Sequence, residues 1–444
     1  MSFPRHEKYK DSGVEWLGEL PEHWSIEKFR YCFRESPEKI ENEVVGEMLS
    51  VSGYRGIEIK EYDDENRRRT DEDLIGYRIV RKGQLVVNTM WLNYAGLGVS
   101  SFEGHVSPAY RSYWIADNLN KRFIHYLLRS SLYVNGYTKY LTGIRPNSLQ
   151  MSRDDLMAFP ILIPSQHEQY TIAAFLDRET AKIDALIAEQ QRLIELLKEK
   201  RQAIISHAVT KGLNPDAPMK DSGIAWMGWV AEHWSLPKIR YVARVENGTT
   251  PSRNNLDYWM DGDIPWLSSG EVNQYAVTEA SEHITSLALR ECSLRLLPRG
   301  TIIVGLIGQG KTRGLSAQLE IEATINQNLA AIIPDQSLSP KYLHYILQAA
   351  YEYLREYGRG GQQAALNCEI LADMRLPLPP LDEQLLISAT LDEQTANLDA
   401  LTAEAQRAIT LLQERRTALI SAAVTGKIDV RGLVTAQSTV EAAA

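Results

Sequence analysis

The segment Gly305–Thr312 is the stretch of this chain whose residue types most directly suggest chemistry. It reads Gly-Leu-Ile-Gly-Gln-Gly-Lys-Thr and satisfies the G-x-x-x-x-G-K-[ST] spacing with which a P-loop cradles nucleotide phosphates. A P-loop runs directly into a helix whose N-terminus faces those phosphates. Here Arg313-Gly314-Leu315-Ser316 follows without helical periodicity. We therefore favour a loop that contacts DNA phosphates and base edges, with nucleotide binding as the alternative.

The remaining reactive residue types do not assemble into a catalytic or metal site. His125 and His344 occupy matching apolar helical contexts, and neither is accompanied by a matched nucleophile or a metal-ligand cluster. The three cysteines, Cys32, Cys292 and Cys368, are widely spaced, which excludes a CxxC pair and favours a reducing cytoplasm. A glycine-rich S-adenosylmethionine loop and an Asn-Pro-Pro-aromatic tetrad are both absent. We expect no enzymatic activity, cofactor or metal in this chain.

Loop chemistry instead selects side chains that could contact DNA. In the first half, Thr89–Gly98 mixes aromatics, amides and glycines after a strand, and Gly143–Pro146 forms a turn among basic residues. The second half offers loops rich in glycine, arginine and amides. Arginine and amide side chains can pair bidentately with guanine or adenine, and lysine more often takes phosphate. The predicted DNA contacts are Asn88, Trp91, Asn93, Tyr94, Arg145, Asn147, Arg253, Gln309, Lys311, Arg313, Asn328, Arg359 and Gln362.

Composition sets the frame for these loops. The chain has 444 residues, 44% of them hydrophobic and 24% charged, which predicts several globular domains with apolar cores. The net charge of −9 is mildly unfavourable for DNA binding, but binding depends on a local basic face. The sequence contains no apolar run of about 18 residues, so it predicts no membrane span.

The element that must position the loops is a long helix over Ser165–Gly212. Ser165 followed by Glu168 forms a capping-box start, and Gly212 is a C-terminal stop. Apolar residues at coiled-coil spacing predict a seam of Ile183, Leu186, Leu193, Leu197 and Ile204. At about 1.5 Å per residue, such a helix would be roughly 66 Å long.

This helix occurs twice. A second copy runs from about Leu381 to Gly426, offset by 215 residues (from Ile163 to Leu378), with a copied seam of Leu398, Leu401, Ala408, Leu412 and Leu419. The globular parts also correspond, with Lys10-Asp11-Ser12-Gly13 against Lys220-Asp221-Ser222-Gly223 at an offset of 210. Because the offset drifts between landmarks, insertions lie in the globular parts. A period this long indicates duplicated domains.

The sequence resembles the specificity subunits of type I restriction–modification systems. The resemblance rests on Lys-Asp-Ser-Gly-x-x-Trp and Glu-His-Trp, on Gly248–Arg253 and Ile264–Val272, and on the Glu-Gln start of each long helix. It covers about residues 5–430. It implies an α+β chain in which two mixed α/β target-recognition domains are joined by two long antiparallel coiled-coil helices, as a pseudo-twofold repeat. The expected domains are target-recognition domains 1–160 and 213–375, spacer helices 161–212 and 376–430, and a disordered tail 431–444.

The resemblance also implies a function without catalysis. Each target-recognition domain would read one half of a bipartite asymmetric site in double-stranded DNA. The helix pair would set the half-site spacing and dock two methyltransferase subunits, through which restriction/translocase subunits assemble. S-adenosylmethionine, ATP and Mg would be bound by those partners. A coiled-coil adaptor that does not read DNA remains a further alternative.

Overall fold

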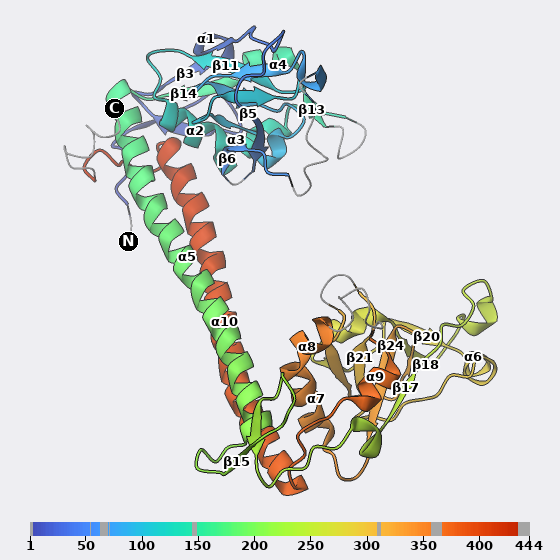
Figure 1. Ribbon diagram of the computed structural model, residues 1–444. Helices are drawn as coiled ribbons and strands as arrows, with labels where there is room; N and C mark the ends of the chain where they lie inside the picture. Colours follow the sequence, from blue (N-terminus) through green and yellow to red (C-terminus); the bar gives the residue numbers. More distant parts are fainter. Residues whose placement is uncertain are drawn as a thin grey trace. The chain divides into compact units, whose positions relative to one another are not determined.

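The chain divides into two compact units, each an α/β globular part with portions of two long helices. The computed structural model describes residues 3–433 apart from 54, 63–69, 71, 144–148, 309–311 and 357–365. Unit 1 comprises residues 1–190 and 407–444, and unit 2 comprises residues 191–406. The long helices are α5 (Gln166–Lys211) and α10 (Leu381–Val424) (Figure 1). The expected α+β organisation is confirmed. Most of the predicted tail, from residue 434 onward, lies outside the described residues.

Unit 1 contains two four-stranded sheets within its described residues. The first has the order β6–β5–β10–β7, from β5 (Glu47–Ser52), β6 (Gly56–Ile59), β7 (Arg78–Val80) and β10 (Gly104–Val106). The second has the order β4–β11–β8–β9, from β4 (Phe33–Glu35), β8 (Leu85–Val87), β9 (Leu97–Val99) and β11 (Arg111–Ile115). Two-stranded pairs add β1 (Tyr9–Asp11) with β2 (Glu19–Pro21), β3 (Ser25–Lys28) with β14 (Pro160–Ile163), and β12 (Leu141–Thr142) with β13 (Gln150–Met151).

Short helices cover these sheets. They are α1 (Phe29–Cys32), α2 (Lys121–Arg129), α3 (Ser131–Thr138) and α4 (Arg153–Ala158). Helix α2 begins where the Asn120 side chain accepts a hydrogen bond from the Phe123 amide. Its buried side chains, at the 3.6-residue period, anchor the sheet edge that carries β9.

Unit 2 is organised around a five-stranded sheet of order β17–β24–β21–β22–β19. Its strands are β17 (Ala243–Asn247), β19 (Ala276–Val277), β21 (Ile302–Gly305), β22 (Ser316–Leu319) and β24 (Leu329–Pro334). Smaller sheets contain β15 (Met219–Asp221), β16 (Trp229–Ala231), β18 (Ile264–Leu267), β20 (Glu282–Ile284) and β23 (Thr324–Ile325). The helices are α6 (Ser286–Glu291), α7 (Pro340–Ala349), α8 (Tyr351–Glu356) and α9 (Cys368–Asp373). Ile302, Ile303 and Val304 are fully buried, as apolar β-branched runs predict for a central strand.

The ends of α5 are those predicted from its local sequence. The Ser165 hydroxyl accepts a hydrogen bond from the Glu168 amide at 3.3 Å, and the Glu168 carboxylate accepts one from the Ser165 amide at 3.3 Å. Gly212 closes the helix at φ +77°, where a side chain would be strained, and Gly426 does the same after α10 at φ +70°. Among the described residues, no helix is sufficiently long and apolar to span a membrane.

The predicted helix seam is right at Ile183, Leu197, Leu398 and Leu419 and wrong at three of its leucines. Leu186, Leu193 and Leu401 are exposed at 47%, 42% and 55%, whereas the neighbouring isoleucines are buried. The buried row on the two helices consists of Ile183, Ile187, Ile194, Leu197, Ile205, Leu398, Ala405, Ile409, Leu419 and Ile420. Leucine and isoleucine stand next to each other at Leu186–Ile187 and Leu193–Ile194, so the sequence offers two apolar rows along the helix. Contact with the partner helix determines which of the two rows is buried.

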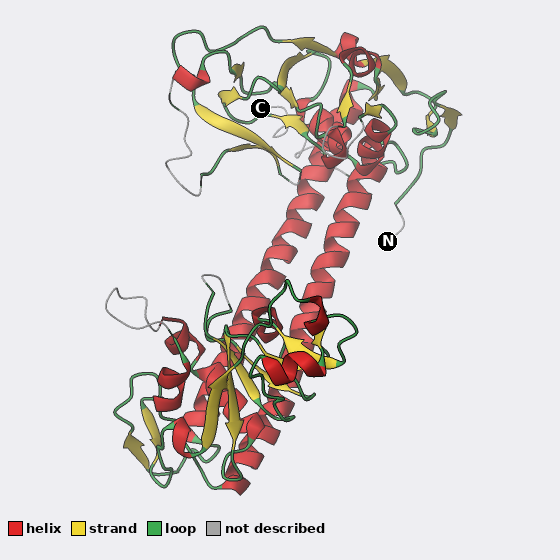
Figure 2. Ribbon diagram, turned by 90° about the vertical axis from the view of Figure 1, so that its right-hand side faces the viewer, coloured by secondary structure: helices red, strands yellow, loops and turns green. Residues whose placement is uncertain are grey.

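Two ion pairs fix the helix register. Arg416 on α10 contacts Asp184 on α5 at 2.9 Å in unit 1, and Arg201 on α5 contacts Asp399 on α10 at 3.2 Å in unit 2. Partner numbers fall on α10 as they rise on α5, so the helices run antiparallel. In each unit the α5 and α10 segments lie side by side (Figures 1 and 2). The two pairs are equivalent in the repeat, since 184 to 399 and 201 to 416 are both offsets of 215 residues.

Candidate nucleic-acid interface

An exposed aromatic pair marks the hairpin loop between β8 and β9. Trp91 is 57% exposed and Tyr94 is 63% exposed, with ring centroids 5.8 Å apart. Between them the chain forms a 3-10 turn over Leu92–Tyr94, and Leu92 is fully buried beneath it. A large apolar ring held outward on a buried anchor is suited to contact with a base edge or a thymine methyl group.

Arg129 at the end of α2 holds this loop in place. Its guanidinium donates to the carbonyls of Ala95, Leu97, Ser52 and Gly53 at 2.5–3.2 Å. Burial lowers the pKa of Arg129 to about 10, so the group stays charged at neutral pH. Sequence analysis missed this role, which the helical position of Arg129 does not reveal. Arg129 therefore ties the end of the loop, at Ala95 and Leu97, to the segment Ser52–Gly53.

The two asparagines predicted to contact DNA from this loop are less exposed than its two aromatic residues. Asn88 is buried. Its side-chain oxygen accepts a hydrogen bond from the Met90 backbone amide at 3.2 Å, and its backbone amide donates one to the Gly96 carbonyl at 2.7 Å. Asn93 is half-buried, and its side-chain oxygen is buried without a hydrogen-bond partner. Asn88 thus positions the turn, and direct contact of either asparagine with DNA stays a prediction.

The hairpin β12–β13 adjoins the aromatic loop. The Met151 amide donates to the Thr89 carbonyl at 3.2 Å, and the Gln150 side chain donates to the Thr89 hydroxyl at 3.3 Å. Arg145 and Asn147, predicted as DNA contacts, come between β12 and β13 in the sequence and lie outside the described residues. The described base of the hairpin contacts Thr89, at the start of the aromatic loop.

In unit 2 the Gly305–Thr312 segment connects two strands. Strand β21 ends at Gly305, and the chain returns as β22, antiparallel to it. The P-loop alternative required a helix here, and a strand follows instead. Gln309 and Lys311 lie outside the described residues, while Arg313 is half-buried at the following turn.

Two further contacts gather loops around this connection. The Leu306 amide donates to the Asn328 carbonyl at 2.9 Å, so half-buried Asn328 lies at the loop's start. Gly314 packs on α8, where an added Cβ would lie 3.1 Å from Leu354. Arg359 and Gln362 come shortly after α8 and lie outside the described residues.

The β8–β9 and β21–β22 loops are equivalent in the repeat, as the two matched histidines show. Nδ1 of His125 accepts from the Val99 amide at 3.3 Å, and Nε2 of His344 donates to the Ser316 carbonyl at 3.0 Å. Each histidine thus pins the strand that follows the loop, β9 or β22, to a helix. Burial lowers the pKa of His125 to about 3 and that of His344 to about 4, so both are neutral. The structural role expected for them is confirmed.

Arg253 is held by an acidic and an aromatic partner. Its guanidinium donates to both carboxylate oxygens of Glu282 at 2.6 and 2.9 Å and lies 3.8 Å above the ring centre of Trp259. The Glu282 carboxylate raises the pKa of Arg253, and Arg253 lowers the pKa of Glu282. This is an oriented, exposed cation. Sequence analysis missed both partners: Trp259, six residues after Arg253, and Glu282, 29 residues after it.

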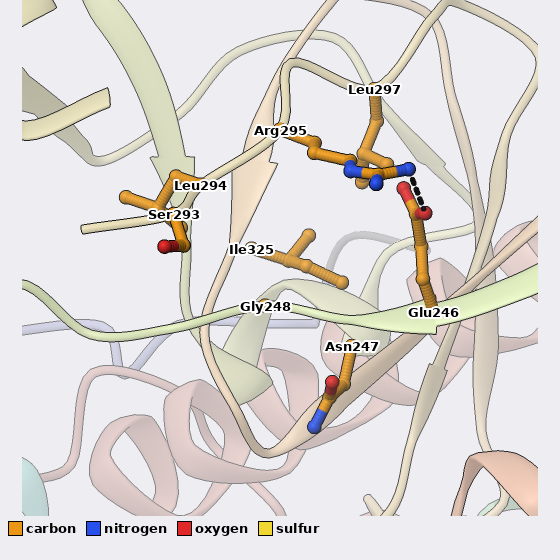
Figure 3. A pocket seen from close by; sticks show the side chains of 8 residues that line it. All are labelled: Glu246, Asn247, Gly248, Ser293, Leu294, Arg295, Leu297 and Ile325. Atoms are coloured by element: carbon orange, nitrogen blue, oxygen red, sulfur yellow. Dashed lines mark hydrogen bonds and ion pairs between the residues drawn. The ribbon is translucent and has the colours of Figure 1, made fainter. Parts of the chain in front are cut away.

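A cavity of about 230 Å³ lies behind the segment that leads to Arg253 (Figure 3). Arg295 donates to Glu246 at 3.2 Å across one side of it. Gly248 lines it and must be glycine, because a Cβ would lie 1.7 Å from the Ile325 carbonyl oxygen. The charged groups in its lining are paired, so we place DNA contact at the loops and not in this cavity.

Comparison with known proteins bears on these loops. A family model for the type I restriction modification DNA specificity domain matches residues 231–411. The type I restriction enzyme MjaIX specificity subunit of Methanocaldococcus jannaschii is 31% identical over 37% of this chain, and the Escherichia coli EcoR124I/EcoR124II specificity subunit is 29% identical over 39%. The matched parts span 38% and 44% of these relatives, less than half of each.

Longer matches are weaker in identity. A third relative, provisionally named the type I restriction enzyme MjaX specificity subunit, is 23% identical over 97% of this chain and 99% of its own length. A solved chain from a study of assembly and conformational transition of the type I R-M system aligns with a TM-score of 0.68 at 15% identity, over 91% of this chain and 98% of its own. The HsdS subunit from Thermoanaerobacter tengcongensis aligns with a TM-score of 0.51 at 17% identity, over 92% and 98%. These structures share the fold.

The matches confirm the resemblance that the motifs indicated. Residues 231–411 match the family model for a type I restriction modification DNA specificity domain, and the chain as a whole is similar to type I restriction enzyme specificity subunits.

Proposed function

We propose that this chain is the non-catalytic subunit that gives a type I restriction–modification complex its DNA sequence specificity. Each recognition domain reads one half of a bipartite, asymmetric site. The observation that carries the proposal is the contrast between equivalent scaffold and divergent loops. Two equivalent histidines support two equivalent hairpin loops, whose sequences differ entirely. A shared support with different exposed side chains suits the reading of two different half-sites.

Equivalent clamps support the same scaffold role for the long helices. Buried Gln169 on α5 accepts from the Asn120 amide at 2.8 Å, and buried Gln384 on α10 accepts from the Ser339 amide at 2.8 Å. Each glutamine fixes the start of its helix to the N-terminus of a domain helix, α2 or α7. The helices can therefore transmit a fixed geometry to the loops, which a spacing device requires.

Exposed leucines support docking of methyltransferase subunits on the helices. Unit 1 exposes Leu186 and Leu411, and unit 2 exposes Leu401 and Leu196. By the 215-residue offset, Leu186 corresponds to Leu401 and Leu196 to Leu411, so each unit presents the same pair. Exposed apolar side chains repeated on a polar helix surface are typical of a protein interface. Two such pairs support two methyltransferase partners.

Mapping methylated adenines in DNA exposed to the assembled complex tests the function. We expect a two-part motif with a fixed gap. Exchanging the exposed Trp91 and Tyr94 for other side chains should alter one half of that motif and leave the other half unchanged. Methylation without a shared motif, or methylation that does not depend on this chain, would favour an adaptor that does not read DNA.

The docking role has its own test. Leu186→Glu with Leu411→Glu should weaken capture of methyltransferase by the chain, while Glu195→Gln, at an exposed position farther along α5, should not. Retention of both methyltransferase subunits by the double variant would contradict docking at the leucines.

A further inference from the structure

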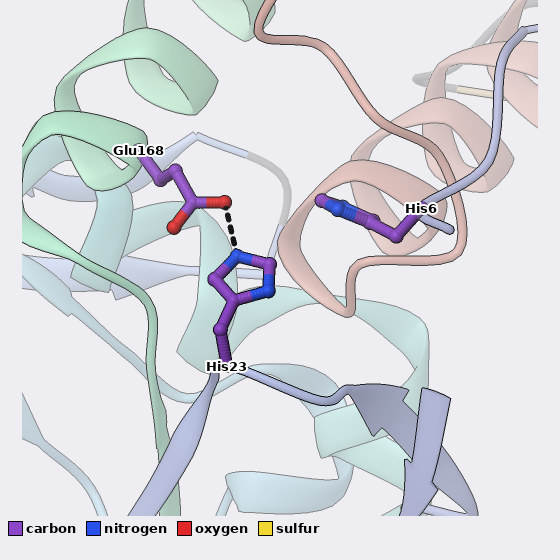
Figure 4. Close-up of side chains that lie close together, drawn as sticks. All are labelled: His6, His23 and Glu168. Atoms are coloured by element: carbon purple, nitrogen blue, oxygen red, sulfur yellow. Dashed lines mark hydrogen bonds and ion pairs between the residues drawn. The ribbon is translucent and has the colours of Figure 1, made fainter. Parts of the chain in front are cut away.

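Two histidines and a glutamate from distant segments meet at the start of α5. They are His6 from the N-terminal segment, His23 from the turn between β2 and β3, and Glu168 from the first turn of α5 (Figure 4). One ring nitrogen of each histidine and one carboxylate oxygen of Glu168 lie within 4.8 Å of one another. Among the residues that the structure describes, no other group of three histidine, cysteine or acidic side chains comes together in this way.

The three side chains differ in their hydrogen bonds. His23 Nε2 lies 2.8 Å from Glu168 Oε1, which also accepts from the Trp24 ring nitrogen at 3.4 Å. The His6 side chain is only 4% exposed, and its Nδ1 is buried without a hydrogen-bond partner. The nearest acidic oxygen, Oδ2 of Asp429, is 3.9 Å away. An unpartnered buried imidazole nitrogen is costly unless something binds it.

Solvent reaches the group from one side. His6 and His23 line a cavity of about 450 Å³ together with Glu7, Lys8, Glu22 and Arg431. His23 is 44% exposed in its side chain and can rotate. Ligand atoms bound tetrahedrally to one Zn²⁺ at about 2.0–2.1 Å lie roughly 3.4 Å apart. His23 Nε2 and Glu168 Oε1, at 2.8 Å, are closer than that spacing, and no pair of the three atoms is more than 4.8 Å apart, so small side-chain movements separate this arrangement from a metal-bound one.

We infer that His6, His23 and Glu168 form a binding site for one divalent transition-metal ion of the zinc type. Two imidazoles and one carboxylate are ligands that zinc, cobalt and nickel accept, whereas magnesium and calcium prefer oxygen alone. Water from the cavity completes the coordination. Metal binding takes each imidazole in its neutral form.

Both acidic and basic side chains surround the three proposed ligands. Asp429 faces His6, but its carboxylate is held by Arg431 at 2.6 Å. Asp429 makes no hydrogen bond to His6 Nδ1, which leaves this nitrogen available to a metal. Arg431 and Lys8 border the cavity and disfavour a cation, so Glu168 supplies the unpaired negative charge.

The site would clasp both ends of unit 1. The Asp429 amide donates to the Pro4 carbonyl at 2.8 Å, and the Tyr9 hydroxyl donates to the Gly426 carbonyl at 3.0 Å. The segment with His6 thus already lies along the chain that follows α10. A metal on His6, His23 and Glu168 would tie this segment to α5, and so fix the beginning of unit 1 to its two helices.

The second half of the chain supplies an internal control. His233 lies 2.9 Å from Glu383, and the Trp234 ring nitrogen donates to Glu383 at 3.2 Å, which repeats the His23–Glu168 arrangement. At the 210-residue offset, the position of His6 is occupied by Asp216, which is exposed. The histidine–glutamate pair alone is therefore part of the repeat, and only the first half has the third ligand.

The test uses the full chain without an affinity tag, freed of metal with chelator and titrated with Co²⁺ and then Zn²⁺. We expect one equivalent of Co²⁺ with visible d–d absorption that Zn²⁺ abolishes. Removal of an outer ligand partner typically costs 10–100-fold in metal affinity, so His6→Gln and His23→Gln should each lower Zn²⁺ affinity at least about 100-fold. His233→Gln should leave it unchanged.

Thermal unfolding separates metal binding from folding. In chelator, His6→Gln should unfold at the temperature of the natural chain, and Zn²⁺ should raise the unfolding temperature of the natural chain and of His233→Gln only. If His6→Gln binds Co²⁺ as tightly as the natural chain, or if His233→Gln lowers Zn²⁺ affinity equally, the site is refuted. These measurements need no DNA, so failure here leaves the DNA-reading proposal untouched.

Discussion

At the scale of single residues, the aromatic pair on the β8–β9 loop makes the sharpest claim about DNA. Trp91→Ala combined with Tyr94→Ala should weaken DNA binding by the assembled complex by about 1–3 kcal/mol for each base that a ring no longer touches. The fold should persist, because both rings are exposed and the turn is held by Arg129 and buried Leu92. Fluorescence anisotropy with cognate DNA measures the decrease in affinity.

Trp229 provides the matched control for that prediction. It is 57% exposed, as Trp91 is, but lies on strand β16 away from the β21–β22 loop sequence. Trp229→Ala should leave DNA affinity unchanged. Equal affinities for the natural chain and the Trp91/Tyr94 double variant would contradict the placement of the interface on this loop.

The two buried histidines predict how stability depends on pH. Their folded pKa values, about 3 for His125 and about 4 for His344, lie below the ordinary value of 6.5. A depressed histidine pKa means that the unfolded chain binds more protons, so stability is complete above pH 6.5 and falls as pH decreases. Between pH 7 and pH 5, each histidine should cost about 2 kcal/mol of unfolding free energy.

His344→Gln isolates one of these contributions. A glutamine amide can still donate to the Ser316 carbonyl but takes up no proton in this range. Urea unfolding at pH 7 and pH 5 should show that the natural chain loses about 2 kcal/mol more than the variant does. Parallel decreases in the two proteins would show that His344 is not a buried neutral imidazole.

At the scale of elements, the corrected helix seam can be tested with adjacent residues. Ile187 is 7% exposed and faces α10, whereas Leu186 is exposed on the outer surface. Ile187→Ala should lower the unfolding free energy by about 2–5 kcal/mol, the usual cost of truncating a buried aliphatic side chain. Leu186→Ala should cost far less. The reverse order in chemical denaturation would restore the seam predicted from leucine spacing.

The same helices show what the sequence could predict. Their ends depend on residues within a few positions, namely Ser165, Glu168 and the two closing glycines, so local reasoning located them correctly. The seam depends on which face meets a helix some two hundred residues away, and local spacing chose the wrong residue at three positions. The equivalence of the β8–β9 and β21–β22 loops was likewise hidden, because the repeat offset drifts through the globular parts.

The candidate site residues also divide into those set by local sequence and those set by contacts between distant segments. The exposure of Trp91 and Tyr94 follows from a loop sequence that mixes glycines with aromatics. The burial of Asn88 depends on its closing the turn through Met90 and Gly96, a contact that composition does not reveal. Glu282 reaches Arg253 only because β20 pairs with β18, and such long-range pairing cannot be inferred from residue types.

At the scale of the whole molecule, the antiparallel helices make a prediction about the recognised sequence. The equivalent ion pairs Asp184–Arg416 in unit 1 and Arg201–Asp399 in unit 2 show that the α5 and α10 segments pair in the same way within each unit. A heptad inserted in α5 between these acidic and basic positions, matched by a heptad in α10, preserves that register and the buried row. If the helix pair acts as the spacing device, the insertion must change the DNA gap.

The expected change follows from element dimensions. Seven residues add about 10.5 Å of helix, which is close to three base pairs at about 3.4 Å each. Methylation mapping should then give both half-sites unchanged and a gap longer by about three base pairs. A heptad inserted in α5 alone is the control, because it leaves one helix unmatched and should lower stability. An unaltered gap with the matched insertion would mean that the recognition domains, and not the helices, set the spacing.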